Sequence, residues 1–170
     1  MKPGLLFIWL AISLSVYSQD TVNRRLYNPS ANAEKEIAEA VKEAKKSNRH
    51  VFVQVGGNWC GWCLKFDLFL RKDTSLLNML NRNYVVCHVN YSPENKNAEL
   101  MKRYRYPNRL GFPVFLILNK DGELIHTQNS AYLEEKDGYS SKNVKEFFRD
   151  WSPRELSDER WEFLKRSEKN

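Results

Sequence analysis

The residues best suited to chemistry in this sequence are two cysteines, Cys60 and Cys63, which stand three positions apart. An apolar run at residues 51–55 precedes them, then Gly56-Gly57, and a helical apolar pattern follows, which indicates a strand, a tight turn and a helix. A helix that begins at Cys60 presents unpaired backbone N–H groups, which stabilise a thiolate. Cys60 is therefore the predicted nucleophile, and Cys63, on the same helical face, would resolve a mixed disulfide by attacking Cys60.

Two other interpretations are that the cysteines are unreactive residues buried in the core or that they are ligands of a zinc ion. Zinc needs about four ligands, whereas the sequence has no second C-x-x-C motif and its 3 histidines show no ligand spacing. A structural disulfide is also poorly motivated, because closing so short a loop removes little chain entropy. We therefore predict a redox-active Cys60–Cys63 disulfide with neither a metal nor an organic cofactor.

The third cysteine, Cys87, lies in an apolar stretch. We predict that it is a buried small hydrophobic residue, because unpaired cysteines commonly occupy such places. The alternative is a third redox thiol or an intermolecular link.

The N-terminus has the pattern of a secretory signal peptide over residues 1–18. Lys2 supplies the positive charge, residues 5–14 form an apolar segment, and Val16 and Ser18 place small side chains before a cleavage site at Gln19. The apolar run is short for a membrane span, so an uncleaved anchor helix is the less favoured alternative. The prediction is an exported protein, periplasmic or secreted, in which a cysteine pair can persist as a disulfide.

The chain of 170 residues is basic, with a formal charge of +6, and 42% of its residues are hydrophobic. This length suits one domain with a packed core. Lysine and glutamate are interspersed almost everywhere, which indicates solvated faces of mixed sign. For the basic and aromatic stretch 102–109, a solvated helix end is favoured over a surface that holds acidic substrate segments. No nucleic-acid partner is predicted.

Apolar periodicity divides the chain into alternating helices and strands. Residues 19–29 are polar without a clear period and are predicted to be a linker, followed by a domain over residues 30–151 and a C-terminal helical tail at 152–170. The predicted elements are a helix capped by Ser30 or Asn32, a strand at 50–55, a helix at 60–72, a second helix capped by Asp73, a strand at 84–91, a helix at 95–104, strands at 114–118 and 123–128, a loop at 129–141 and a helix at 144–151. The tail carries Leu156, Trp161 and Leu164, which are candidates to pack on the domain.

This order of elements predicts an α/β fold with a central mixed β-sheet flanked by helices on both faces. Two motifs lie in that framework: Trp-Cys-Gly-Trp-Cys at residues 59–63, after a strand, and Gly-Phe-Pro at residues 111–113, before a hairpin. On these motifs the chain resembles the thioredoxin superfamily and is most similar to exported bacterial thioredoxin-like proteins with a Trp-Cys-Gly-x-Cys site. The similarity covers residues 31–151 and implies the thioredoxin fold.

The resemblance implies a substrate groove beside the cysteines, formed by five residues: Trp59, Gly61, Trp62, Phe112 and Pro113. Pro113 matches the family's cis-proline, and Phe112 would pair with the backbone of the substrate. The alternative for Pro113 is a trans proline that starts a strand. Trp59 is favoured as part of an apolar platform for an extended partner, whereas Trp62 is divided evenly between that role and ordinary packing.

Gln54 departs from the family pattern. Thioredoxins usually carry a buried aspartate here, which accepts the proton of the resolving cysteine. A glutamine forms hydrogen bonds but cannot titrate. Gln54 is therefore predicted to modulate the site, with altered resolution by Cys63.

These observations together predict an exported thiol–disulfide oxidoreductase that reduces or isomerises disulfides in exported proteins. Its partners would be disulfide-containing exported proteins and a membrane thiol donor, and the sequence leaves its redox potential and oligomeric state open. The alternative is a thioredoxin-fold binding or chaperone-like module whose cysteine pair is redox-switched but not catalytic.

Overall fold

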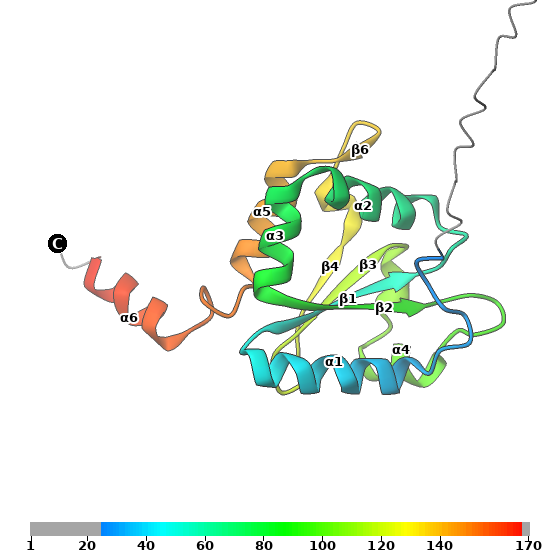
Figure 1. The fold of residues 1–170 in the computed structure, drawn as a ribbon, viewed down its shortest axis with the longest axis horizontal. Helices are drawn as coiled ribbons and strands as arrows, with labels where there is room; N and C mark the ends of the chain where they lie inside the picture. The colour runs from blue at the N-terminus through cyan, green and yellow to red at the C-terminus, as the bar shows by residue number, and fades with distance from the viewer. Residues whose placement is uncertain (1–24, 168–170) are drawn as a thin grey trace, which may run out of the picture.

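A computed structural model of the chain describes residues 25–167, and its centre is a four-stranded mixed sheet (Figure 1). The strands are β1 (His50–Gly56), β2 (Tyr84–Asn90), β3 (Val114–Leu118) and β4 (Leu124–Asn129), in the order β2-β1-β3-β4. β1 pairs parallel with β2 and antiparallel with β3, and β3 pairs antiparallel with β4. Every residue of β1 and β3 is buried, as expected for central strands covered on both faces.

Helices cover both faces of this sheet (Figure 1). One face carries α1 (Ala33–Ser47) and α4 (Ala98–Arg103), and the other carries α2 (Gly61–Lys72), α3 (Thr74–Asn83) and α5 (Ser141–Asp150). The predicted α/β fold is thus confirmed. Side chains of β1 alternate between the two cores: Val51, Val53 and Val55 pack with α1, whereas Phe52 packs with the helices on the other face.

N-cap side chains start two of the helices at the residues that the sequence predicts. The Asn32 side chain accepts a hydrogen bond from the backbone N–H of Lys35 at 3.0 Å, so Asn32 rather than Ser30 caps α1. The Asp73 carboxylate accepts from the N–H groups of Ser75 and Leu76 and caps α3. Such caps satisfy N–H groups that lack a partner within the helix.

Two segments differ from the sequence prediction. The helix expected at 95–104 begins only at Ala98, because Asn97 has a left-handed backbone and the Asn95 side chain donates to the carbonyl of Pro29 instead. The loop expected at 129–141 contains a 3-10 turn (Ser130–Leu133) and a small hairpin of β5 (Glu134–Glu135) and β6 (Gly138–Tyr139). The hairpin is held by Tyr139, whose ring lies 4.8 Å from that of Phe66 on α2, a long-range contact without a local sequence signal.

The linker prediction is wrong for the part of residues 19–29 that the structure describes. Tyr27 is only 1% exposed. Its backbone N–H donates to Oδ1 of Asn58 at 3.1 Å, and Nδ2 of Asn58 donates to the Tyr27 carbonyl at 2.7 Å. These contacts join residues 25–29 to the domain. The predicted signal peptide at 1–18 lies outside the described residues.

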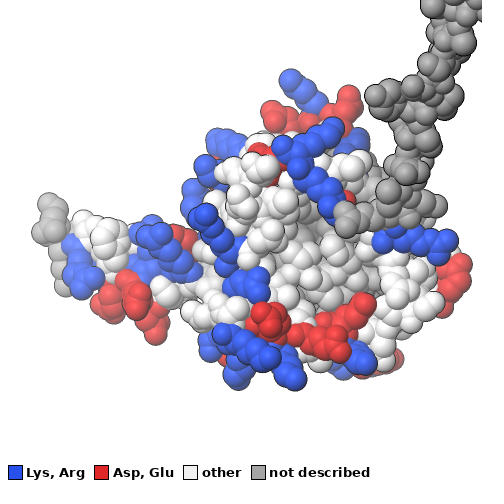
Figure 2. Space-filling view, viewed as in Figure 1, with Lys and Arg blue, Asp and Glu red and all other residues white. Residues whose placement is uncertain are grey.

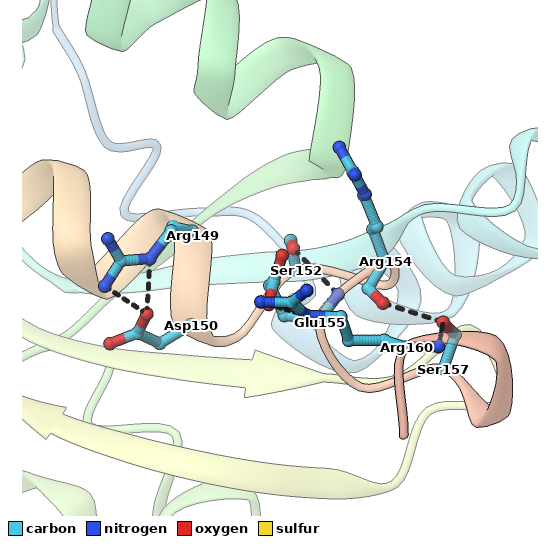
Figure 3. Close-up of polar contacts among 7 residues, drawn as sticks. All are labelled: Arg149, Asp150, Ser152, Arg154, Glu155, Ser157 and Arg160. Carbon is cyan, nitrogen blue, oxygen red and sulfur yellow. Dashed lines mark hydrogen bonds and ion pairs between the residues drawn. The ribbon is translucent and has the colours of Figure 1, made fainter. Parts of the chain in front are cut away.

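The C-terminal tail does not pack on the domain. Helix α6 (Asp158–Ser167) contains no buried residue and lies away from the sheet (Figure 1). The connector from α5 is shaped by its own contacts, shown in Figure 3: Ser157 Oγ donates to the Arg154 carbonyl at 2.7 Å, and Arg160 Nε donates to Glu155 Oε2 at 2.8 Å. The tail therefore has local order without a hydrophobic core.

The surface carries charges of both signs. Lys and Arg side chains alternate with Asp and Glu over the face drawn in Figure 2. Within residues 25–167, no helix is long and apolar enough to cross a membrane.

Candidate active site

The two cysteines lie at the first turn of α2 and form a disulfide. Their sulfur atoms are 2.05 Å apart and their Cα atoms 5.2 Å apart. Cys60 is the N-cap residue of the helix, and the backbone N–H of Cys63 donates to Cys60 Sγ at 3.1 Å. Cys60 is 5% exposed and Cys63 is fully buried. Solvent and substrate therefore reach Cys60 first, and the N–H group of Cys63 would stabilise a thiolate on Cys60 after reduction.

An aromatic wall stands beside this disulfide. Trp59 is 57% exposed, yet its Nε1–H donates to the carbonyl of Tyr91 at 2.7 Å. The ring of Phe112 contacts Trp59 edge-on at 5.4 Å and Tyr91 at 4.8 Å. A Cβ at Gly57 would collide with the Trp59 indole and with the Tyr91 carbonyl, so the wall requires glycine there. An exposed but anchored indole of this kind is suited to bind an apolar partner.

A hollow of about 590 Å³ opens between Trp59 and the loop after β2. Its lining residues are Trp59, Tyr91, Ser92, Pro93, Glu94 and Lys96. Trp59, which lines the hollow, directly precedes Cys60 in the chain. The hollow is large enough for one or more side chains of a bound polypeptide.

The proline loop completes the groove. The Phe112–Pro113 peptide bond is cis, as the family resemblance predicted. Phe112 packs against the cluster that contains Cys60 and Cys63. A Cβ at Gly61 would meet no atom, so the surface beside Cys60 is open. The structure thus brings these predicted groove residues together around the disulfide.

Trp62, like Phe112, packs against the cluster that contains Cys60 and Cys63, and it also contacts the β5–β6 hairpin. Its ring packs edge-on against Tyr139 at 5.5 Å, and the ammonium of Lys65 lies 4.2 Å from the ring centroid. The Tyr139 hydroxyl donates to the Trp62 carbonyl at 3.2 Å. These contacts anchor the β5–β6 hairpin to α2 and give Trp62 a packing role.

A buried amide, that of Gln54, lies next to Cys63 on the core side of the disulfide, at the position where thioredoxins usually carry an aspartate. Gln54 is 1% exposed, and its Nε2 donates to Tyr27 Oη at 2.7 Å and to the Cys63 carbonyl at 3.2 Å. Burial raises the pKa of Tyr27 far above its usual range, so this phenol is neutral. Gln54 lies below the resolving cysteine, where the family comparison placed it.

Tyr27, Asn58 and Tyr91 are site residues that the sequence reasoning missed. Tyr27 lies in a polar stretch without periodicity, and only the Leu26-Tyr27 pair gave a weak apolar signal. Tyr91 was assigned to a strand face but not to the site. Their roles depend on contacts between segments far apart in the chain.

Cys87 is separated from the site. It packs in the core on the α1 side of the sheet, and burial raises the pKa of its thiol to about 12. A neutral buried thiol agrees with the predicted role as a small hydrophobic residue. In the part of the chain that the structure describes, no group of three or more His, Cys, Asp or Glu is placed to hold a metal ion.

The basic stretch at 102–109 lies mostly in solvent. Lys102, Arg103, Arg105 and Arg109 are exposed, and Arg103 forms an ion pair with Glu34 at 2.8 Å. This arrangement is that of the solvated helix end favoured from sequence.

Comparison with known proteins agrees with this geometry. A family model described as thioredoxin-like matches residues 32–120. A disulphide isomerase from Xylella fastidiosa Temecula1 is similar with a TM-score of 0.67 and 23% identity, over 75% of this chain and 97% of that one. The DsbH oxidoreductase has a TM-score of 0.52 and 19% identity, over 71% of this chain and 82% of that one. At these identities the likeness shows the fold alone. A search of curated proteins found no match.

Proposed function

Because the chain belongs to the thioredoxin-like family and carries the cysteine pair of a thiol–disulfide oxidoreductase, we propose that it reduces or isomerises disulfides in exported proteins. One observation carries the proposal. The sulfur of Cys60, the less buried of the two cysteines, caps α2, accepts the Cys63 N–H at 3.1 Å and lies beside the anchored Trp59 and Phe112.

The reaction starts from the reduced pair. The Cys60 thiolate attacks one sulfur of a substrate disulfide, so that the substrate S–S bond breaks and its other sulfur leaves as a thiolate, which takes a proton from solvent. Cys63, as a thiolate, then attacks Cys60 Sγ and releases the second substrate thiol. Two electrons pass to the substrate, and Cys60–Cys63 becomes the disulfide seen in the structure. In isomerisation, the thiolate of a different cysteine of the substrate attacks the substrate sulfur of the mixed disulfide instead, which forms a new substrate disulfide and releases the Cys60 thiolate.

The groove would hold an extended segment of the substrate. The family resemblance supports backbone pairing between Phe112 and such a segment, and the hollow beside Trp59 can take an apolar side chain that flanks the substrate cysteine. Binding an extended chain through backbone hydrogen bonds and side-chain pockets is a common mode of peptide recognition.

Export is the second part of the proposal. The pattern of residues 1–18 supports a secretory signal peptide. Outside the cytoplasm, a reductase needs a source of electrons, and a membrane thiol donor would supply them by exchanging its own dithiol with the Cys60–Cys63 disulfide.

Turnover of a generic protein disulfide tests the chemistry. We expect the wild type to reduce the substrate with a chemical thiol as the electron source, Cys60→Ser to lose this activity, and Cys87→Ser, the matched control, to keep it. Cys63→Ser should accumulate mixed disulfides with its clients, because the second attack is lost. Equal rates for wild type and Cys60→Ser would contradict catalysis and leave a binding module.

A further inference from the structure

A buried tyrosine from the N-terminal segment packs in one cluster with the two cysteines, on the same side of β1 as the sulfur of Cys63. The evidence is the backbone at Gly56, the last residue of β1. A Cβ built there would meet Cys63 Sγ, and it would meet Tyr27 Oη at 2.8 Å. The sulfur and the phenol oxygen therefore lie over the same point of the strand, and only glycine leaves room for both. Tyr27, Cys60 and Cys63 form one buried cluster.

The hydrogen bond from Gln54 leaves the Tyr27 hydroxyl as a donor rather than an acceptor toward other groups. Both N–H bonds of the Gln54 amide are used, one toward Tyr27 Oη and one toward the Cys63 carbonyl. A phenol oxygen that accepts a hydrogen bond still has its own proton to donate. Among residues 25–167, no atom accepts that proton in the oxidised protein, and the Cys63 sulfur is a group with lone pairs that lies beside the same point of the strand as the phenol oxygen.

We propose that, in the reduced protein, Tyr27 donates a hydrogen bond to the sulfur of Cys63 and that Gln54 positions Tyr27 for this contact. This inference rests on the proposed function, since it describes how Cys63 becomes the second nucleophile. A neutral donor favours the charged form of the group that it contacts. The Tyr27–Gln54 pair would thus stabilise the Cys63 thiolate directly, whereas a buried carboxylate in this place would instead take up its proton.

The N-terminal segment is held in the position that this role requires. Asn58, which directly precedes Trp59 and Cys60, exchanges two hydrogen bonds with the backbone of Tyr27. The ring of His88 on β2 contacts Tyr27 edge-on at 5.6 Å. The backbone of Tyr27 is therefore held by the active-site loop and its ring by β1 and β2, which restricts the movement of the phenol relative to Cys63.

The titratable groups around Tyr27 are either neutral or held in an ion pair. Burial raises the pKa of Tyr27 and lowers that of His88, so both are neutral. Asp67 on α2, which acts on both Tyr27 and His88, is paired with Arg71 at 2.7 Å. Tyr139, which also faces this region, has its pKa raised by burial.

The test is a direct titration of Cys63. In a full-length chain with Cys60→Ser and Cys87→Ala, Cys63 is the one remaining thiol, and thiolate absorbance in the ultraviolet reports its pKa. Adding Tyr27→Phe should raise that pKa by about one unit, as expected for the loss of one hydrogen bond to an anion. Gln54→Met, which removes the support of the phenol, should raise it in the same direction. The second variant keeps the test decisive should Tyr27→Phe fail to fold.

Tyr84→Phe is the matched control. Tyr84, the first residue of β2, is also 1% exposed, and its hydroxyl donates to the Phe148 carbonyl at 2.8 Å. The substitution therefore also removes one hydrogen bond of a buried phenol, but away from Cys63. We expect no change in the Cys63 titration. An unchanged Cys63 pKa in both Tyr27→Phe and Gln54→Met, or an equal rise in Tyr84→Phe, would overturn the inference. Because the titration needs no turnover, its outcome is independent of the reductase assay, and either proposal can fail alone.

Discussion

The two ends of the described chain behave in opposite ways. Residues 25–29 are mostly polar, yet Tyr27 is 1% exposed and lies beside the disulfide. Helix α6 carries Trp161 and Phe163, yet Trp161 is 59% exposed and the helix has no buried residue. The difference shows that apolar content alone does not dock a terminal segment. Docking also needs a cavity of matching shape and hydrogen-bond partners, which Gln54 supplies for the Tyr27 hydroxyl and Asn58 for the Tyr27 backbone, at one end only.

The comparison predicts its largest effect for Tyr27→Ala. Removing a fully buried aromatic ring leaves a cavity, and we expect the free energy of unfolding to fall by about 3 kcal/mol. Trp161→Ala, the matched aromatic truncation at the other end, should change it by about 0.5 kcal/mol or less. Urea unfolding of both oxidised proteins measures this. Equal losses would mean that the two ends do not differ as described.

A smaller effect is expected for Asn58→Ala. This change removes both hydrogen bonds that hold the backbone of Tyr27, and we expect a loss of about 1–2 kcal/mol. Asn83→Ala, which removes one hydrogen bond to the Met79 carbonyl in a helix, is the control. Hydrogen exchange should also show faster exchange of the Tyr27 amide in Asn58→Ala. Unchanged exchange there would contradict the role of Asn58 as the link between the segment and the loop.

The third effect in size is a loss of stability in acid, through His88, whose ring contacts Tyr27. Burial lowers the pKa of His88 below its ordinary value of 6.5, so the unfolded chain binds this proton more readily than the folded protein. The stabilising contribution is complete above that ordinary value and decreases as the pH falls below it. His50 is shifted in the same direction by burial and contributes with the same sign.

Urea unfolding at about pH 7.5 and about pH 5.5 measures this dependence, and we expect a loss below about 1 kcal/mol from His88. His88→Gln, which cannot be charged, should reduce the difference between the two conditions. If His88→Gln shows the same pH dependence as wild type, this histidine is not its source.

The smallest effect is expected for removing α6. A chain that ends after Ser157 loses no buried side chain among residues 158–167, so its unfolding free energy should stay within about 0.5 kcal/mol of wild type. Its disulfide reductase rate should also be unchanged, because α6 lies away from the site (Figure 1). A substantial loss of either property would show that the tail docks on the domain in solution.

Most of the fold could be predicted because its signals are local. The apolar runs of β1 and β3, the Asp73 cap and the turn that ends at Gly122 depend on neighbouring residues. The groove prediction depended on two short motifs, and the structure places Trp59 and Phe112 beside the cysteines and has the Phe112–Pro113 bond in the cis form, as these motifs implied. The β5–β6 hairpin could not be predicted, because Tyr139 is held by rings on α2.

By itself, the sequence determined the cysteine pair, its place at a helix start, the cis-proline motif and the replacement of an acid by Gln54, since these depend on residue identity and short spacing. Only the tertiary structure decided that Tyr27 lies over Gly56 beside Cys63, that Trp62 packs on the hairpin and that α6 stays exposed. The physical reason is that burial of these side chains depends on which distant segments supply a cavity and hydrogen-bond partners. That complementarity exists only once the sheet and its helices have come together.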